Sequence, residues 1–205
     1  MKLVVAVGGA SGALYARRLL DFLAAEGPAL GVSVDLLFTE AGALVWRHEL
    51  GAVPSYAFPV WSNRDLTAPF ASGSARYDAM VVVPCSAAGL ARIAHGVSTD
   101  LTGRAADVML KERRRLVLCL REAPLSLVHA RAITQVTEAG AVVVPASPSF
   151  YGRPRSVEEL ADTVVSRLLD RLDVPNELIR RWDGLRPGAR AEAGPPAGAA
   201  TGEEG

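Results

Sequence analysis

The sequence predicts a single α/β domain of the doubly wound, Rossmann-like or flavodoxin-like kind, with a parallel sheet covered by helices on both faces. Three observations support this class. Short apolar runs alternate with longer segments of helical period, these runs are continuous, and a glycine-rich turn follows the first of them. A chain of 205 residues is long enough for one such domain with a substantial core.

The expected strands are rich in valine and leucine and lack polar alternation, which is typical of strands buried on both faces. They are residues 2–7, 33–38, 79–83, 116–120 and 141–144. The expected helices are residues 11–25, 40–49, 86–94, 100–113, 126–139 and 156–172. Because the strands of this class are parallel, the loops that follow them should meet at the carboxyl edge of the sheet, where ligands bind.

Two segments do not fit this alternation. Residues 51–77 contain several prolines and are expected to form an irregular excursion. From residue 184 onward the chain consists mainly of Gly, Pro, Ala, Arg and Glu. Such a composition cannot bury enough apolar surface to offset the entropy of ordering, so we expect a disordered tail (184–205) after a domain of residues 1–183.

Charge and composition exclude several classes of protein. Lys and Arg together number 22, as do Asp and Glu, so a nucleic acid or an acidic membrane is not an expected partner. No apolar stretch approaches the roughly 18 residues of a membrane span, and the start lacks a signal-peptide core, which predicts a cytoplasmic protein. Cys85 and Cys119 are expected to be buried reduced thiols. His48, His95 and His129 are scattered, so no metal site is predicted.

The turn after the first expected strand, residues 8–13, reads GGASGA. Glycines allow close approach of the backbone to a ligand, and the helix that follows offers free N–H groups to an anion. The alternative is a plain tight turn in which Ser11 caps the helix. The full G-x-G-x-x-G pattern is absent, so a mononucleotide fits better than a dinucleotide.

Three further loops at the same edge carry polar motifs. Ser86 follows the third expected strand, where it can cap the next helix or contact a ligand. Arg121 and Glu122 follow the fourth; arginine can hold an anion, and glutamate beside cations can exchange a proton. Tyr151 follows the fifth, with Arg167 on the next helix; they form either a surface turn or a clasp for a small apolar phosphate. Together these motifs predict one shared ligand site.

A charged helical segment lies between the third and fourth expected strands. Arg104, Asp107 and Lys111 recur at i, i+3 and i+7 and therefore share one helix face. The face is either solvated or presents its cations to a phosphate at a subunit junction.

These motifs resemble the UbiX-type flavin prenyltransferases. The resemblance covers about residues 2–183 and rests on GASGA at 9–13, SGS at 72–74, PCS at 84–86, RAADV at 104–108, LKER at 110–113, REAP at 121–124 and FY at 150–151. It implies transfer of a dimethylallyl group from dimethylallyl phosphate to N5 and C6 of reduced FMN, without a metal. It further implies a homododecamer with sites at subunit interfaces, and a UbiD-type decarboxylase as recipient of the prenylated FMN.

The resemblance also implies residue roles. Residues expected to contact FMN are Gly9, Ala10, Ser11, Thr39, Ser86, Ala87, Ala88, Gly89 and Arg121. Residues expected to hold the prenyl phosphate are Ser74, Arg104, Lys111, Tyr151 and Arg167. Residues expected to act in the reaction are Ser11 and Glu49 beside the flavin, Lys111 at the phosphate, and Glu122 as proton donor to the departing phosphate and later acceptor from C6.

Some positions depart from the family pattern. Gly89 replaces a common threonine, and Leu66 falls near a tryptophan of relatives, whereas Trp182 matches a terminal tryptophan and could form an aromatic wall. Two alternatives remain. An FMN-dependent decarboxylase of the phosphopantothenoylcysteine type would need a catalytic histidine and a Pro-x-Met-Asn motif, and this motif is absent from the sequence. A non-catalytic flavin carrier would not need Glu49, Lys111 or Glu122.

Overall fold

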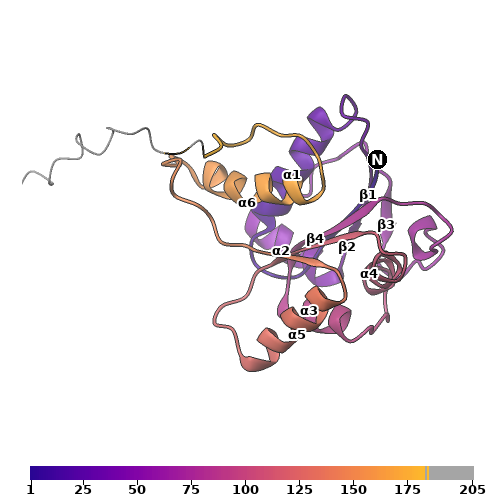
Figure 1. The fold of residues 1–205 in the computed structure, drawn as a ribbon. Helices are drawn as coiled ribbons and strands as arrows, with labels where there is room; N and C mark the ends of the chain where they lie inside the picture. The colour runs from indigo at the N-terminus through magenta and orange to yellow at the C-terminus, as the bar shows by residue number, and fades with distance from the viewer. Residues whose placement is uncertain (183, 185–205) are drawn as a thin grey trace, which may run out of the picture.

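Six parallel strands form one sheet in the order β3-β2-β1-β4-β5-β6 in the computed structural model, which describes residues 1–182 and 184 (Figure 1). The strands are β1 (Lys2–Val7), β2 (Ser33–Phe38), β3 (Val60–Ser62), β4 (Ala79–Cys85), β5 (Arg115–Leu120) and β6 (Val142–Pro145). The predicted doubly wound α/β class is confirmed. The disordered tail predicted from residue 184 lies, apart from Gly184, outside the described residues.

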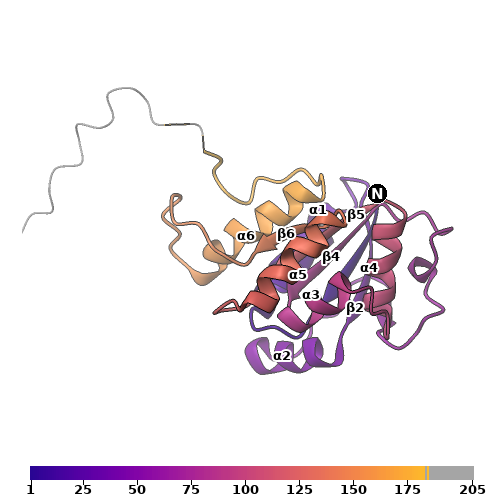
Figure 2. The same cartoon turned by 60° about the horizontal axis from the view of Figure 1, so that its bottom comes forward.

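Helices cover both faces of the sheet (Figure 2). They are α1 (Ala13–Glu26), α2 (Glu40–Leu50), α3 (Ala87–Ala94), α4 (Leu101–Lys111), α5 (Leu127–Glu138) and α6 (Val157–Arg171). On one face α1 and α6 pack together over a core that includes Leu19 and Leu168. On the other face α3, α4 and α5 cover a second core that includes Leu90 and Met109.

The position of β1 in the middle of the sheet explains its continuous apolar run. Leu3, Val5 and Val7 belong to one core, and Val4 and Ala6 belong to the other. All five residues are fully buried. Because both faces of the strand need apolar side chains, no polar alternation remains, as predicted.

The region 51–77, predicted to be irregular, contains a strand that the prediction missed. β3 pairs in parallel with β2, with Val60 opposite Leu36 and Ser62 opposite Phe38. Three residues are too few to reveal a period, and Pro59 directly before them suggested a loop. A short 3-10 helix, Pro69–Ala71, follows in the same region. The five predicted strands alone would have the flavodoxin order, and β3 at the edge extends it to the Rossmann order.

The strand order reverses between β1 and β4. The chain moves outward from β1 through β2 to β3, then returns to the other side of β1 for β4, β5 and β6. Ligands of doubly wound sheets bind outside the carboxyl ends of the strands at such a switch point. The glycine-rich turn after Val7 lies there.

Both cysteines are buried and unpaired, as predicted. Burial raises the pKa of the Cys85 thiol and that of the Cys119 thiol to about 12 each. Cys85 belongs to the core under α3, α4 and α5, whereas Cys119 belongs to the core under α1 and α6. Since the two side chains lie on opposite faces of the sheet, they cannot form a disulfide without movement of the backbone.

Candidate functional site

The turn after β1 leads directly into α1. Gly12 is the N-cap of this helix and has a left-handed backbone (φ 107°) that favours glycine, which has no side chain for capping. The alternative in which Ser11 caps the helix is therefore wrong. Glu49, at the end of α2, supplies the cap: its carboxylate accepts hydrogen bonds from the N–H of Gly12 at 3.0 and 3.1 Å and from the N–H of Ala13 at 2.8 Å.

The surroundings of Glu49 favour its charged form. Burial alone would raise the pKa of Glu49, but the Ser11 hydroxyl, the two N–H groups and the positive charge of Arg121 outweigh burial and lower it. The N-terminus of α1 also favours a negative charge. Three residues predicted to contribute to the site, Ser11, Glu49 and Arg121, therefore lie in one neighbourhood.

Close backbone packing explains the first two glycines of the turn. A Cβ on Gly8 would stand 2.3 Å from the carbonyl oxygen of Pro84, and one on Gly9 would stand 2.3 Å from Cβ of Ala41. Both distances are far below normal contact, so the turn passes between the end of β4 and the start of α2 with no space for side chains. Ala10, which follows, is buried.

Two hydroxyl groups predicted to contact a ligand serve as helix caps. Thr39 Oγ1 accepts a hydrogen bond from Gly42 N at 2.9 Å at the start of α2. Ser86 Oγ accepts one from Gly89 N at 3.1 Å at the start of α3. The capping alternative for Ser86 is confirmed, and its ligand contact stays a prediction because the hydroxyl can still donate.

The start of α3 presents small residues beside the turn. Ala87 is buried, Ala88 is exposed and Gly89 is half-buried. A Cβ on Gly89 would meet Ser86 Oγ at 3.4 Å and Cys85 Sγ at 3.6 Å, which are ordinary contacts. The position therefore has room for a Cβ.

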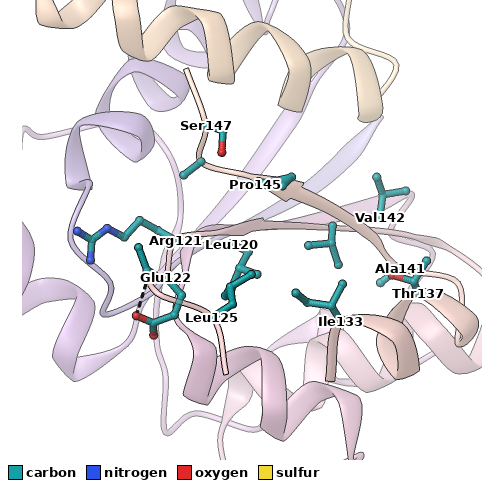
Figure 3. Close-up of a pocket in the computed structure, with 13 residues that line it drawn as sticks. Leu120, Arg121, Glu122, Leu125, Ile133, Thr137, Ala141, Val142, Pro145 and Ser147 are labelled. Atoms are coloured by element: carbon teal, nitrogen blue, oxygen red, sulfur yellow. Dashed lines mark hydrogen bonds between the residues drawn. The ribbon is translucent and has the colours of Figure 1, made fainter. Parts of the chain in front are cut away.

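Arg121 and Glu122 follow the end of β5, as predicted. Arg121 N donates to the carbonyl of Cys85 at 2.9 Å, which fixes this loop to the end of β4. Figure 3 shows Arg121 and Glu122 at one end of a pocket of about 590 Å³ that extends along β6 and α5. Its apolar lining includes Leu120, Leu125, Ile133, Val142 and Pro145.

Arg104 and Asp107 lie side by side on α4. Arg104 Nη1 donates to Asp107 Oδ2 at 2.9 Å, and Arg104 Nε donates to the carbonyl of Ala71 at 2.9 Å. The predicted charged face is confirmed, and its arginine also holds the last residue of the 3-10 helix. Asp107 neutralises part of its charge.

Lys111 ends α4 and lies against the predicted SGS motif. Lys111 Nζ donates to Glu112 Oε1 at 2.6 Å. A Cβ on Gly73 would stand 2.2 Å from Glu112 Oε1 and 3.0 Å from Lys111 Nζ, so the loop passes directly over this pair. Ser74 Oγ lies 2.9 Å from Ser72 Oγ in the same loop. Ser74 and Lys111 are therefore neighbours, as predicted.

Lys111 and Glu122 lie at opposite ends of β5. Lys111 ends the helix before the strand begins at Arg115, and Glu122 follows the strand end at Leu120. A strand of six residues spans roughly 17 Å. One chain therefore carries two separate groups of predicted site residues: a carboxyl-edge group (Ser11, Glu49, Arg121, Glu122) and an α4 group (Ser74, Arg104, Lys111).

Tyr151 and Arg167 are linked through the end of the described chain. The ring of Tyr151 lies 5.7 Å from that of Trp182, between ring centroids. Arg181, the residue before Trp182, donates to both oxygens of Asp170, and Asp170 lies 3.8 Å from Arg167 Nη1. Trp182, which was predicted as an aromatic wall, therefore contacts Tyr151. Leu66, where the sequence departs from the family pattern, is 55% exposed and offers no aromatic ring.

Three residues that lie against these residues were not predicted as part of a site: Tyr15, Glu112 and Asp170. Tyr15 lies beside Gly12. Burial, followed by the Cys119 thiol, raises the pKa of Tyr15 above its ordinary value, although the charge of Arg121 opposes this shift. Glu112 pairs with Lys111, and Asp170 joins Arg181 to α6. For Asp170 a signal existed, since it lies three residues after Arg167 on one helix face.

Residues 1–182 and 184 hold neither a cluster of metal ligands nor a membrane-spanning helix. Within that part of the chain, no three His, Cys, Asp or Glu residues gather where they could hold a metal ion. Among the same residues, no helix combines the length and the apolar character needed to cross a bilayer.

Comparison with known proteins identifies the family. The Flavoprotein family matches residues 1–169. The flavin prenyltransferase UbiX of Thermoplasma acidophilum is 42% identical over 89% of this chain and 100% of its own length. The structure of AnUbiX (PadA1) in complex with FMN and dimethylallyl pyrophosphate has a TM-score of 0.84 and 42% identity, covering 90% of this chain and 98% of the other. A dodecameric FMN-dependent UbiX-like decarboxylase from Escherichia coli O157:H7 has a TM-score of 0.82 and 36% identity, covering 90% and 100%. The chain belongs to the UbiX flavin prenyltransferases, within the Flavoprotein family.

Proposed function

We propose that this protein is a flavin prenyltransferase that joins a dimethylallyl group from dimethylallyl phosphate to N5 and C6 of reduced FMN. The observation that carries the proposal is the joint position of Ser11, Glu49 and Arg121 at the switch point, in a chain 42% identical to a flavin prenyltransferase. The product is prenylated FMN, which we propose is passed to a UbiD-type decarboxylase.

The carboxyl-edge group fits a flavin mononucleotide. The glycine turn brings backbone close to the crevice. The Ser86 hydroxyl, which accepts from Gly89 N, can still donate to a ligand, whereas the Thr39 hydroxyl already donates to the carbonyl of Val7 at 3.3 Å. We propose that Gly9, Ala10, Ser11, Thr39, the segment 86–89 and Arg121 hold FMN. When bound, the flavin would supply two nucleophilic positions. We propose that Ser11, which is hydrogen-bonded to Glu49, accepts or relays a proton there.

Glu122 is proposed as the acid that assists departure of the phosphate. Cleavage of the allylic C–O bond leaves negative charge on phosphate and spreads positive charge over the prenyl group. A proton from Glu122 and cations around the phosphate stabilise this charge separation. The face of Tyr151, with Trp182 beside it, favours the cationic prenyl group by about 0.5–2 kcal/mol.

The α4 group is proposed to act on the phosphate from a neighbouring subunit. Lys111 stands at the far end of β5 from Glu122, so another copy of the chain is needed to bring Ser74, Arg104 and Lys111 to the same phosphate. The similarity to a dodecameric relative supports such an assembly. The apolar pocket beside Glu122, flanked by the exposed Leu125, is the proposed contact face.

We propose the cytoplasm as the compartment and residues 1–183 as the catalytic domain. Two buried free thiols support a reducing environment. The family match to residues 1–169, extended by the contact of Trp182 with Tyr151, supports the domain limits.

The test is anaerobic incubation of the protein with reduced FMN and dimethylallyl phosphate, followed by mass measurement of the extracted flavin. The proposal predicts a gain of one five-carbon prenyl unit, absent without the phosphate donor. Unchanged FMN that is nevertheless bound by the protein would indicate a flavin carrier instead. Protein that takes up no FMN at all would refute the proposal.

A further inference from the structure

The chain after α6 returns across that helix and is fastened to it by a polar network. Val174 is buried, and Leu178 packs against the core beneath α1 and α6. Asn176 Oδ1 accepts a hydrogen bond from Ser166 Oγ at 2.8 Å, and Ser166 is 1% exposed. Figure 1 shows this yellow segment ending beside the orange loop that precedes α6. We call residues 173–182 the return segment.

Asp170 fastens the far end of the return segment. Its Oδ1 accepts from Arg181 Nη2 at 2.7 Å and from Asn176 Nδ2 at 3.1 Å, and its Oδ2 accepts from Arg181 Nη1 at 3.1 Å. Arg181 Nη2 also donates to the carbonyl of Asn176 at 3.2 Å. The bond to Arg181 is the main cause that lowers the pKa of Asp170. A two-pronged arginine–carboxylate pair of this kind fixes direction as well as distance.

The Arg181–Asp170 pair holds the residue directly before Trp182. Trp182 is 67% exposed and Tyr151 is 88% exposed, so the contact between their rings is made at the surface. Packing in the core therefore does little to hold either ring. Because adjacent Cα atoms are about 3.8 Å apart, fastening Arg181 confines the indole of the next residue.

The same carboxylate lies within reach of Arg167. Arg167 Nη1 stands 3.8 Å from Asp170 Oδ2, which allows attraction but is too long for a hydrogen bond. Arg181 takes both oxygens of Asp170 at shorter distances. Without Arg181, a small rotation would let Arg167 take the carboxylate and turn away from any other anion.

We propose that Asp170 and Arg181 are positioning residues for the prenyl phosphate, acting through one shared carboxylate. By occupying Asp170, Arg181 holds Trp182 beside Tyr151 for the apolar chain and leaves the Arg167 guanidinium available to the phosphate. This inference rests on the proposed function. Its consequence is that the position of the return segment and the phosphate affinity of Arg167 are coupled.

The coupling is tested with Arg181→Gln, Asp170→Asn and the double variant. In Arg181→Gln we expect the Asp170 carboxylate to capture Arg167. The KM for dimethylallyl phosphate should then rise about tenfold, because the phosphate loses one charge-assisted hydrogen bond from Arg167. The turnover number should change less, because Glu122 and Lys111 are untouched. Adding Asp170→Asn to Arg181→Gln should recover much of this loss, because a neutral amide cannot hold Arg167 as strongly. Arg171→Gln, the same change at the end of the same helix, is the matched control and should leave KM unchanged.

A second measurement does not depend on turnover. Inorganic phosphate should protect wild-type protein against unfolding more than it protects Arg181→Gln, with the double variant in between. If Asp170 is merely a structural anchor, the double variant will be as impaired as Arg181→Gln or worse, and the inference is overturned. An unchanged KM in Arg181→Gln overturns it as well. Wild-type protein that forms no prenylated flavin would instead refute the proposed function.

Discussion

Replacing Glu49 tests whether a carboxylate from α2 organises the start of α1. Its oxygens accept three contacts of 2.8–3.1 Å from Gly12 and Ala13, and the N-cap residue itself has no side chain. A helix cap contributes about 0.5–2 kcal/mol. Because the Glu49 side chain is exposed and solvent screens it, we expect Glu49→Ala to cost about 1 kcal/mol, in the lower part of that range. Glu49→Gln keeps one acceptor and should cost roughly half as much.

The pH dependence of this loss follows from the lowered pKa of Glu49. A carboxyl group whose pKa is lower in the folded state stabilises the fold above its unfolded pKa. That contribution disappears as the pH falls below the ordinary value of 4.5 and through the folded value. The difference in stability between wild type and Glu49→Gln should therefore be present at pH 7 and shrink in acid.

Urea unfolding at pH 7 and at about pH 3 measures both effects. Glu138→Gln, which removes an exposed carboxylate at the end of α5, away from the α1 N-terminus, is the control for removal of a carboxylate. A difference between wild type and Glu49→Gln that stays constant with pH would refute the capping role. So would wild-type stability in Glu49→Ala. We also expect Glu49→Ala to slow flavin prenylation more than Glu49→Gln does, because only alanine leaves Ser11 without its acceptor.

Three further predictions concern the same edge of the sheet. Gly8→Ala places a Cβ 2.3 Å from the Pro84 carbonyl and should lower the free energy of unfolding by about 1–3 kcal/mol in a urea titration; unchanged stability would contradict the close packing of β1 and β4. Gly89→Ala meets only ordinary contacts and should stabilise α3 by about 0.5–1 kcal/mol, while Gly89→Thr should tighten FMN binding in a fluorescence titration. Weaker binding by Gly89→Thr would show that the family threonine does not fit here. Glu122→Gln should still bind FMN but prenylate it at least about tenfold more slowly, and a wild-type rate would remove Glu122 from the mechanism.

The regular part of the fold could be predicted because both faces of the central strands are buried. A run such as that of β1 has few alternatives, since five consecutive residues are fully buried. The helix starts were also predictable where a hydroxyl caps them, as Thr39 and Ser86 do. β3 was not, because an edge strand of three residues carries no periodic signal.

The proximity of some predicted site residues could be foreseen from the sequence, whereas the contacts between other elements could not. The rule that ligands bind outside the carboxyl ends of strands correctly grouped Ser11 with Arg121. The cap of α1 by Glu49 spans 36 residues, and no local pattern reveals a contact between separate elements. The position of Lys111 at the far end of β5 depends on the direction of α4, which spacing along a helix does not express.

The central claim is that one reaction site combines the carboxyl-edge group of one chain with the α4 group of another. Mixing equal amounts of Lys111→Ala and Glu122→Gln subunits, each expected to be at least about tenfold slower than wild type alone, tests it directly by the rate of flavin prenylation after co-refolding or co-expression. If sites form between chains, about one site in four receives both intact residues and activity returns to that fraction of wild type. If each chain builds its own site, every site lacks one of the two residues and the mixture stays as slow as its components.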